Sequence, residues 1–351
     1  MRLNLSMASP HLFSRAYKSS RGLFTPHHKP QIQPFYGYNS GVWSEVTAHQ
    51  PTKDSRVPST VMRLLTWNLD AFHSGCEIRV HAALNLLNQE FDNTPKSLPI
   101  VFMLQEISLS GLRQIKASRW IQDNFHMADI SDKYWADKRY GTTTLIDKRL
   151  SIEKVFRLYY DSKFGRDVIF VDVAVDAALG SSFTSKSSSI PKTLRIGNTH
   201  LESLVSNPPL RPAQFATSTR HLKAPWIYAG ILAGDFNAIQ DFDRTLHYEN
   251  KLNDAFLALG GFEDSVEGHT WGYQCEKVLM ERFGPSRMDK VLFCGEIRVD
   301  ELRRIGIGAK VDESRRNELS SLAGGLEWIT DHYGLSAMLT ILPDEGDTSK
   351  I

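Results

Sequence analysis

Short apolar segments recur along the chain, and polar residues follow several of them directly. The segment from Trp226 to Ala233 lies between a proline and a glycine, and it predicts a strand buried on both faces. Asp235, Phe236 and Asn237 follow that glycine. Extended geometry would point Asp235 and Asn237 to one side and Phe236 into the core. Gly-Asp-Phe-Asn is also typical of a turn, so a plain turn is the alternative.

Other apolar segments predict further strands, over 62–68, 100–104, 142–146, 152–159, 168–175, 194–200, 287–293 and 335–342. Helical spacing of apolar residues predicts helices within 77–91, 112–120, 211–223 and 252–259. The strands over 142–175 suggest an antiparallel meander. The segment 312–327 is polar and loop-like, and the Ser-rich 181–189 predicts a flexible loop without function. Strands interleaved with a few helices indicate a sheet protein whose connections gather a site at one edge.

Polar residues at the ends of the predicted strands are the candidates for that site. They are Asn68, Asp70, Glu106, His200, Asp235, Asn237, Asp289, Asp331 and His332. Any one carboxylate is more often a surface charge than a ligand, so the prediction depends on the set as a whole. Carboxylate and amide oxygens without thiolates suit Mg²⁺, or alternatively Mn²⁺, and two histidines can stabilise charge on a phosphoryl oxygen.

Composition narrows the class of protein. With 41 basic and 40 acidic residues there is no global charge that would attract a polyanion, so a phosphate substrate must be held by local charge or by metal. Hydrophobic residues make up 41% of the chain, but no stretch approaches the roughly 18 apolar residues of a membrane span. Cys76, Cys275 and Cys294 show no CxxC spacing, which favours free thiols in a reducing compartment. We expect an intracellular protein that binds no membrane.

The amino-terminal region has a different composition from the rest of the chain. Residues 1–44 contain no acidic residue, and they carry basic residues among Ser, Pro and His. This bias is typical of an organellar transit peptide and equally of a disordered basic tail, and both interpretations stay open. We therefore expect a tail over 1–60, a folded domain over 61–343 and a short tail over 344–351, with the protein in the nucleus or the mitochondrion. Residues 1–44 should be dispensable for folding.

The motifs around the candidates resemble a known family. Their ordered series is Thr66-Trp67-Asn68-Leu69-Asp70, Leu104-Gln105-Glu106, Thr199-His200-Leu201-Glu202-Ser203, Gly234-Asp235-Phe236-Asn237, Arg287-Met288-Asp289 and Thr330-Asp331-His332. This series resembles the endonuclease/exonuclease/phosphatase superfamily over about residues 60–343. The resemblance implies an α/β fold, a four-layered α-β-β-α sandwich of two packed mixed sheets as in DNase I. It also implies a metal-dependent phosphodiesterase.

Within that superfamily the chain resembles the tyrosyl-DNA phosphodiesterase 2 family. The resemblance lies in the Thr-Trp-Asn-x-Asp start, the Thr-His-Leu-Glu-Ser segment, His269-Thr270-Trp271 and Gly165-Arg166-Asp167-Val168-Ile169. It implies hydrolysis of 5′-phosphotyrosyl-DNA bonds in the repair of topoisomerase-DNA adducts. Departures from the family pattern are Phe236, Ile239 and Thr330, and Ile239 replaces an arginine that could contact substrate.

The same resemblance implies a role for each candidate residue. The catalytic residues would be Asp235, Asn237, His332, His200, Asp289 and Asn68, and the residues around the metal would be Glu106, Asn68, Asp70 and Asp331. Arg166, Trp271 and Tyr140 would bind the tyrosine of the substrate. The partner would be a DNA end with a 5′-phosphotyrosyl adduct, single-stranded at that end, and we expect a monomer.

Two alternatives stay open. Another hydrolase of the superfamily, such as an abasic-site endonuclease, a deadenylase, a sphingomyelinase or an inositol-phosphate phosphatase, would use the same core residues. An inactive scaffold or binding module would be marked by loss of Glu106, Asp235 or His332, and all three are present.

Overall fold

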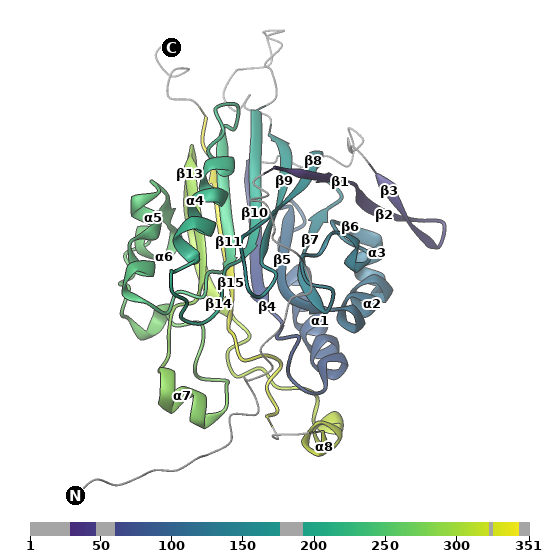
Figure 1. Cartoon of the computed structure of the whole chain (residues 1–351). Helices are drawn as coiled ribbons and strands as arrows, with labels where there is room; N and C mark the ends of the chain where they lie inside the picture. The colour runs from purple at the N-terminus through teal and green to yellow at the C-terminus, as the bar shows by residue number, and fades with distance from the viewer. Residues whose placement is uncertain (1–28, 47–59, 176–191, 323–325, 344–351) are drawn as a thin grey trace, which may run out of the picture.

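Two β-sheets form the centre of the molecule in this computed structural model, which describes residues 29–46, 60–175, 192–322 and 326–343 (Figure 1). The first sheet has seven strands, in the spatial order β1 (Gln31–Gln33), β8 (Ser151–Tyr159), β9 (Asp167–Val175), β10 (Lys192–His200), β11 (Ala229–Asp235), β13 (Asp289–Gly295) and β12 (Asn253–Asp254). The second has eight, in the order β14 (Ile297–Ile305), β15 (Gly334–Ile341), β4 (Val61–Asn68), β5 (Ile100–Ser108), β7 (Tyr140–Asp147), β6 (Phe125–Met127), β2 (Phe35–Asn39) and β3 (Val42–Val46). Both sheets are mixed, because β10–β11 and β4–β5 are parallel and their neighbours are antiparallel.

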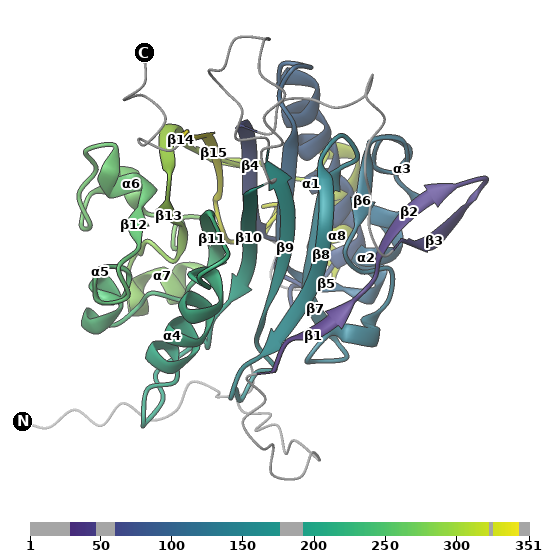
Figure 2. The ribbon, with the colours of Figure 1, turned by 90° about the horizontal axis from the view of Figure 1, so that it is seen from above.

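Helices cover the outer faces of the two sheets (Figures 1 and 2). On one side lie α1 (Cys76–Asn93), α2 (Leu109–Ala117) and α3 (Arg119–Asn124), and on the other lie α4 (Arg211–Leu222), α5 (Leu246–Glu249) and α6 (Ala255–Ala258). Two further helices, α7 (Lys277–Phe283) and α8 (Glu313–Ser321), lie at one end of the sandwich. None of the described helices is long and apolar enough to cross a membrane. The predicted four-layered α-β-β-α sandwich is confirmed.

The layers are held together by separate apolar cores. Between the sheets, Leu64 of β4 packs in one cluster with Ile231 of β11. The next residue of β11, Leu232, belongs to the cluster beneath α4, together with Phe215 of that helix. Successive residues of a strand point to opposite faces, so β11 is buried on both faces as its apolar sequence predicts.

Several predictions about individual elements need correction. The strand over 142–146 is β7 of the second sheet, whereas β8 and β9 pair in the first, so the expected three-stranded meander is wrong. The segment predicted as a loop over 312–327 contains the helix α8, which docks mainly through the buried Leu319. The strand β14 was not predicted because charged residues interrupt the apolar ones along this edge strand. The Ser-rich segment 181–189 lies outside the described residues.

The amino-terminal boundary of the domain also differs from the prediction. β1 pairs with β8 at the edge of the first sheet, and β2 pairs with β3 and with β6 in the second. Residues 31–46 therefore join both sheets, and the predicted start of the folded domain at residue 61 is wrong. Phe35 is fully buried between the sheets, a tertiary contact that the proline-rich local sequence does not reveal. Residues 1–28 lie outside the described part of the chain.

Phe35→Ala should destabilise the domain by about 3–5 kcal/mol, the usual cost of emptying a buried phenylalanine site. Ile32→Ala, in the neighbouring strand but 64% exposed, is the matched control and should change stability by less than about 0.5 kcal/mol. Denaturant unfolding of the two variants measures the difference. Equal stability of both would show that the amino-terminal strands do not belong to the cooperative unit.

Candidate active site

The ends of strands from both sheets bring the candidate residues together. In the first sheet, His200 at the end of β10 is in register with Asp235 at the end of β11, which is in register with Asp289 at the start of β13. Asn68 ends β4 of the second sheet, and its side chain reaches across to Asp235. The shared edge of the two sheets is therefore the site that the sequence predicts.

Backbone geometry at this edge is unusual. Gly234 has a φ of 143°, and a Cβ atom there would lie 1.9 Å from the carbonyl oxygen of Thr199, so only glycine lets β11 approach β10 this closely. Asp70, Glu106 and Asn237 all adopt positive φ, between 47° and 51°. A bulge in the pairing of β5 with β7 accompanies Glu106. In proteins, backbone strain of this kind clusters at functional sites, where side chains must be held in fixed orientations.

Asp235 is the most constrained carboxylate of the site. Its Oδ1 accepts the backbone N–H of Asn237 at 2.8 Å, and its Oδ2 accepts from Nδ2 of Asn68 at 3.0 Å. Burial would raise the pKa of Asp235, but His200, His332 and the donated hydrogen bonds hold it well below its usual range. The strand ends at Asp235 and Asn237 is left-handed, so the expected extended geometry is wrong at Asn237 and the turn alternative describes this residue.

His200 is held as a neutral imidazole. Nη1 of Arg166 lies 2.6 Å from its Nδ1, and because a guanidinium can only donate, Nδ1 must be the acceptor. The ring proton then sits on Nε2, which lies 3.2 Å from Oδ2 of Asp235. Burial, together with the charge of Arg166, lowers the pKa of His200 to about 4.

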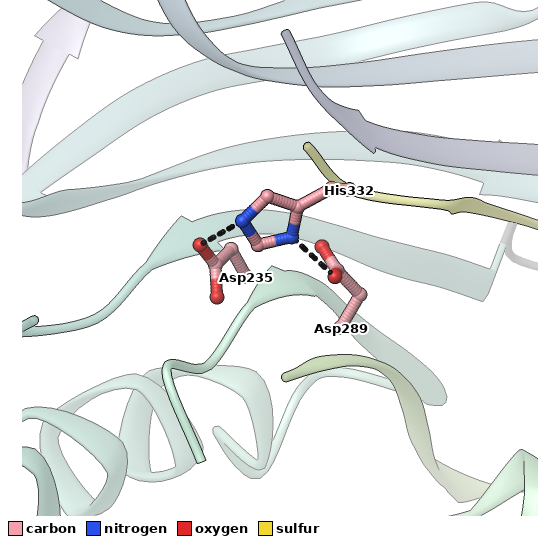
Figure 3. A group of neighbouring side chains, drawn as sticks. All are labelled: Asp235, Asp289 and His332. Carbon is pink, nitrogen blue, oxygen red and sulfur yellow. Dashed lines mark hydrogen bonds and ion pairs between the residues drawn. The ribbon is translucent and has the colours of Figure 1, made fainter. Parts of the chain in front are cut away.

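His332 has the opposite character. Its ring lies between two carboxylates, with Nδ1 2.8 Å from Oδ2 of Asp289 and Nε2 3.8 Å from Oδ2 of Asp235 (Figure 3). Burial alone would lower the pKa of His332, but Asp289, Asp331 and Asp235 raise it well above its ordinary value. The imidazole is therefore charged at neutral pH.

Glu106 lies in a region of excess negative charge. Its Oε1 is 3.7 Å from both Nη1 of Arg166 and Nε2 of His200, too far for hydrogen bonds. Burial raises the pKa of Glu106 to about 8, and the carboxylates of Asp70, Asp331 and Asp235 add to this shift. The charge of Arg166 lowers the pKa of Glu106 in part, and a cation bound closer to the carboxylate would lower it further.

The comparison with known proteins agrees with this geometry. The model of the endonuclease/exonuclease/phosphatase family matches residues 65–332. The chain belongs to this family. A search of curated protein sequences finds no match.

Solved structures of the family share its fold. A humanized D. rerio TDP2 with 14 mutations is 17% identical, with a TM-score of 0.56, over 80% of this chain and 100% of that one. D. rerio TDP2 in complex with single-strand DNA product is 15% identical, with a TM-score of 0.56, over 80% and 99%. An endonuclease/exonuclease/phosphatase from Bacteroides vulgatus is 12% identical, with a TM-score of 0.53, over 80% and 99%.

Among the described residues, one group of side chains lies close enough together to coordinate a metal ion. Ligand atoms of Asp235, Asp289 and His332 all lie within 4.8 Å of one another, and this group could bind a metal ion. A metal ion bound there through His332 would require a neutral imidazole, because the ligating ring nitrogen cannot carry a proton. Glu106, which the sequence predicts as the main ligand, lies outside this group, and its role stays a prediction.

The residues expected to bind tyrosine are largely buried. The hydroxyl of Tyr140 donates to the carbonyl oxygen of Phe164, and the guanidinium of Arg166 lies 5.4 Å from the centre of the Tyr140 ring. Trp271 donates from Nε1 to Oδ2 of Asp331 at 2.7 Å. These residues thus support the site from within, and their contact with a substrate tyrosine stays a prediction.

Two residues that support the site were not identified from the sequence. His73 forms a close ion pair with Asp70, and nothing in the loop sequence marks it. Glu202 is buried and accepts from the hydroxyl of Ser162 and from the N–H of Lys163, so it anchors the loop that leads to Arg166. The Thr-His-Leu-Glu-Ser motif contains Glu202, and that motif was the available signal.

Asp289→Asn should lower the pKa of His332, because the nearest carboxylate that favours the charged ring is lost. Protonation of His332 stabilises the native protein fully below the ordinary imidazole pKa of about 6.5, and this contribution is lost as pH rises through the raised pKa of His332. NMR titration of the imidazole measures the shift. Asp264→Asn, which removes an exposed acid paired with Arg244, should leave the titration unchanged. An unchanged His332 titration in Asp289→Asn would contradict the pairing.

Proposed function

We propose that the protein is a metal-dependent phosphodiesterase that hydrolyses 5′-phosphotyrosyl bonds at DNA ends. The observation that carries the proposal is that a negatively charged carboxylate and a positively charged imidazole lie side by side. Asp235 is an ionised acceptor, and the charged His332 has its Nε2 only 3.8 Å away. A hydrolase needs an acceptor for the attacking water and a cation for the phosphate, and these two residues supply both.

Asp235 would orient the attacking water. Its low pKa keeps it ionised and makes it a weak base, so its main contribution is to fix the water in line with the phosphorus atom and to take up the proton as the bond forms. Asn68 and His200 hold the carboxylate in place. Asn237, whose Nδ2 donates to the carbonyl oxygen of Leu201 at 3.1 Å, would hold the water or a phosphate oxygen.

His332 would stabilise the negative charge that grows on the non-bridging oxygens. Asp289 fixes the ring and keeps it protonated. His200 would contribute the dipole of its N–H but no charge, because it is neutral. The leaving group would be a tyrosyl phenolate with a parent pKa of about 10, which departs more easily than an alkoxide and so has less need of a general acid.

The residues around Glu106 fit a divalent cation. Asp70, Glu106 and Asp331 add their charges to those of Asp235 and Asp289, and an anionic phosphate could not approach this group without a compensating cation. Glu106, with help from Asn68, would hold Mg²⁺ or Mn²⁺, and Asp70 and Asp331 would support it. When bound, the ion polarises a phosphate oxygen and neutralises developing charge.

The choice of substrate is supported by likeness to TDP2. The chain resembles that family in its motifs, and one TDP2 structure of the same fold holds a single-strand DNA product. Other hydrolases of the superfamily remain the second candidate because their core residues are the same. Purified protein should therefore be assayed with Mg²⁺ on a 5′-phosphotyrosyl oligonucleotide, an abasic duplex, sphingomyelin and poly(A). Preference for any of the last three would overturn the proposed substrate.

Excess chelator should abolish hydrolysis, and Glu106→Gln should remove most of it while the protein stays folded. The amide keeps the shape of the side chain but loses the charge that would hold the cation. Glu249→Gln, on the exposed side of α5, is the matched control and should keep full activity. Turnover that persists in chelator would show that no metal is required.

Asp235→Asn and His332→Ala should each reduce kcat by about 10²- to 10³-fold, the usual effect of removing a preorganised catalytic group. Asp264→Asn and His81→Ala, at exposed positions, are the matched controls. Steady-state kinetics measures the effect, and circular dichroism checks the fold. Losses below about tenfold in folded variants would contradict the assigned roles.

A further inference from the structure

A pair of stacked tyrosines lies beside the site and is not used in the chemistry above. The rings of Tyr273 and Tyr333 are parallel within 8°, with centroids 6.1 Å apart. Tyr333 is nearly buried, at 8% exposure, whereas Tyr273 remains 42% exposed. Tyr273 is therefore an aromatic ring that is supported from below and open to solvent.

Contacts around the pair hold both rings in place. The hydroxyl of Tyr273 lies 3.1 Å from Nδ1 of His269. The guanidinium of Arg304 lies 5.6 Å from the centre of the Tyr333 ring, and its Nη1 donates to the carbonyl oxygens of Val266 and His269 at 2.8 and 2.9 Å. A ring fixed in this way loses little conformational freedom when a ligand stacks on it.

The pair is joined directly to the catalytic residues by the backbone. Tyr333 follows His332, and its N–H donates to the carbonyl oxygen of Thr270. Tyr273 lies two residues beyond Trp271, which forms a β-bridge with His332. The stacked pair and His332 therefore lie on the same two paired segments of the chain, 270–273 and 332–333.

An exposed tyrosine by itself needs no explanation, since single apolar side chains are common on protein surfaces. What distinguishes Tyr273 is the combination of an open ring, a parallel aromatic support and a neighbouring cation. Proteins that bind single-stranded nucleic acids use aromatic side chains in this way, because every base has a face that can stack.

We propose that Tyr273 is a stacking site for a nucleobase near the reacting phosphate of a single-stranded nucleic acid end. The inference rests on the proposed function and identifies the part of the substrate that this side of the site would bind. Tyr333 and Arg304 are positioning residues that support the ring. Because stacking does not distinguish the bases, the site would bind strands of any sequence.

Binding of a fluorescently labelled single-stranded oligonucleotide with a 5′-phosphate tests the proposal. Anisotropy is measured with Mg²⁺ in the Asp235→Asn background, where turnover is suppressed. Tyr273→Leu should weaken binding by about 10- to 100-fold, the range for loss of one stacked base, whereas Tyr273→Phe should retain it. Tyr248→Leu removes a 79% exposed tyrosine from α5 and should have no effect.

Oligonucleotides with one abasic residue at successive positions from the 5′ end locate the stacked base. At one position, removal of the base should weaken binding to the parent but cause no further loss in Tyr273→Leu. Equal binding by Tyr273→Leu and its parent would overturn the proposal. A loss in Tyr273→Leu that is independent of the abasic position would also overturn it, since the residue would then act on the fold.

A substrate without a base separates this inference from the proposed function. In the active protein, Tyr273→Leu should leave hydrolysis of a 5′-phosphotyrosyl oligomer made only of abasic residues within about twofold of the parent. A larger loss on this ester would contradict a role confined to base stacking. If the parent protein hydrolyses no phosphodiester at all, the proposed function fails, while the anisotropy measurement still decides whether Tyr273 binds a base.

Discussion

Negative charge gathered at one end of the sandwich is the constraint on which the site depends. Asp70, Glu106, Asp235, Asp289 and Asp331 are largely buried there, and buried carboxylates are stable only when they are paired. These carboxylates differ in how close their cationic and hydrogen-bonding partners are. Asp235 and Asp289 share His332 and receive hydrogen bonds, whereas Glu106 has only distant cationic or N–H groups. This inequality divides the site into an ionised acceptor, a charged imidazole and a carboxylate whose cationic neighbour, Arg166, is 3.7 Å away.

The fold maintains this division because the groups come from strands that cannot move independently. His200, Asp235 and Asp289 lie in register across the first sheet, and Asn68 reaches Asp235 from the second. Any change in the packing of the two sheets would therefore alter the hydrogen bonds of Asp235. The amino-terminal strands reinforce the same packing at the far edges of the sheets, because Phe35 is buried in the core between them.

Much of this arrangement could be predicted from sequence, for a physical reason. A buried strand needs a continuous apolar segment, so Asn68, Asp235 and the residues after it were identifiable as polar groups at strand ends. The burial of Phe35 and the docking of α8 through Leu319 depend on distant partners, which local sequence does not contain. His73 and Tyr273 follow no periodic pattern, and only the spatial structure shows that one pairs with Asp70 and the other stacks on Tyr333.

The position of the bound metal ion tests most directly whether Glu106 holds the cation while His332 stays charged. Diffraction from crystals soaked in Mn²⁺, with anomalous data that identify the ion, measures that position. We expect the anomalous peak at the carboxylate of Glu106, with His332 still hydrogen-bonded to Asp289. A peak between Asp235, Asp289 and His332 would contradict this expectation, because His332 would then be a neutral ligand and not the cation that stabilises the phosphate.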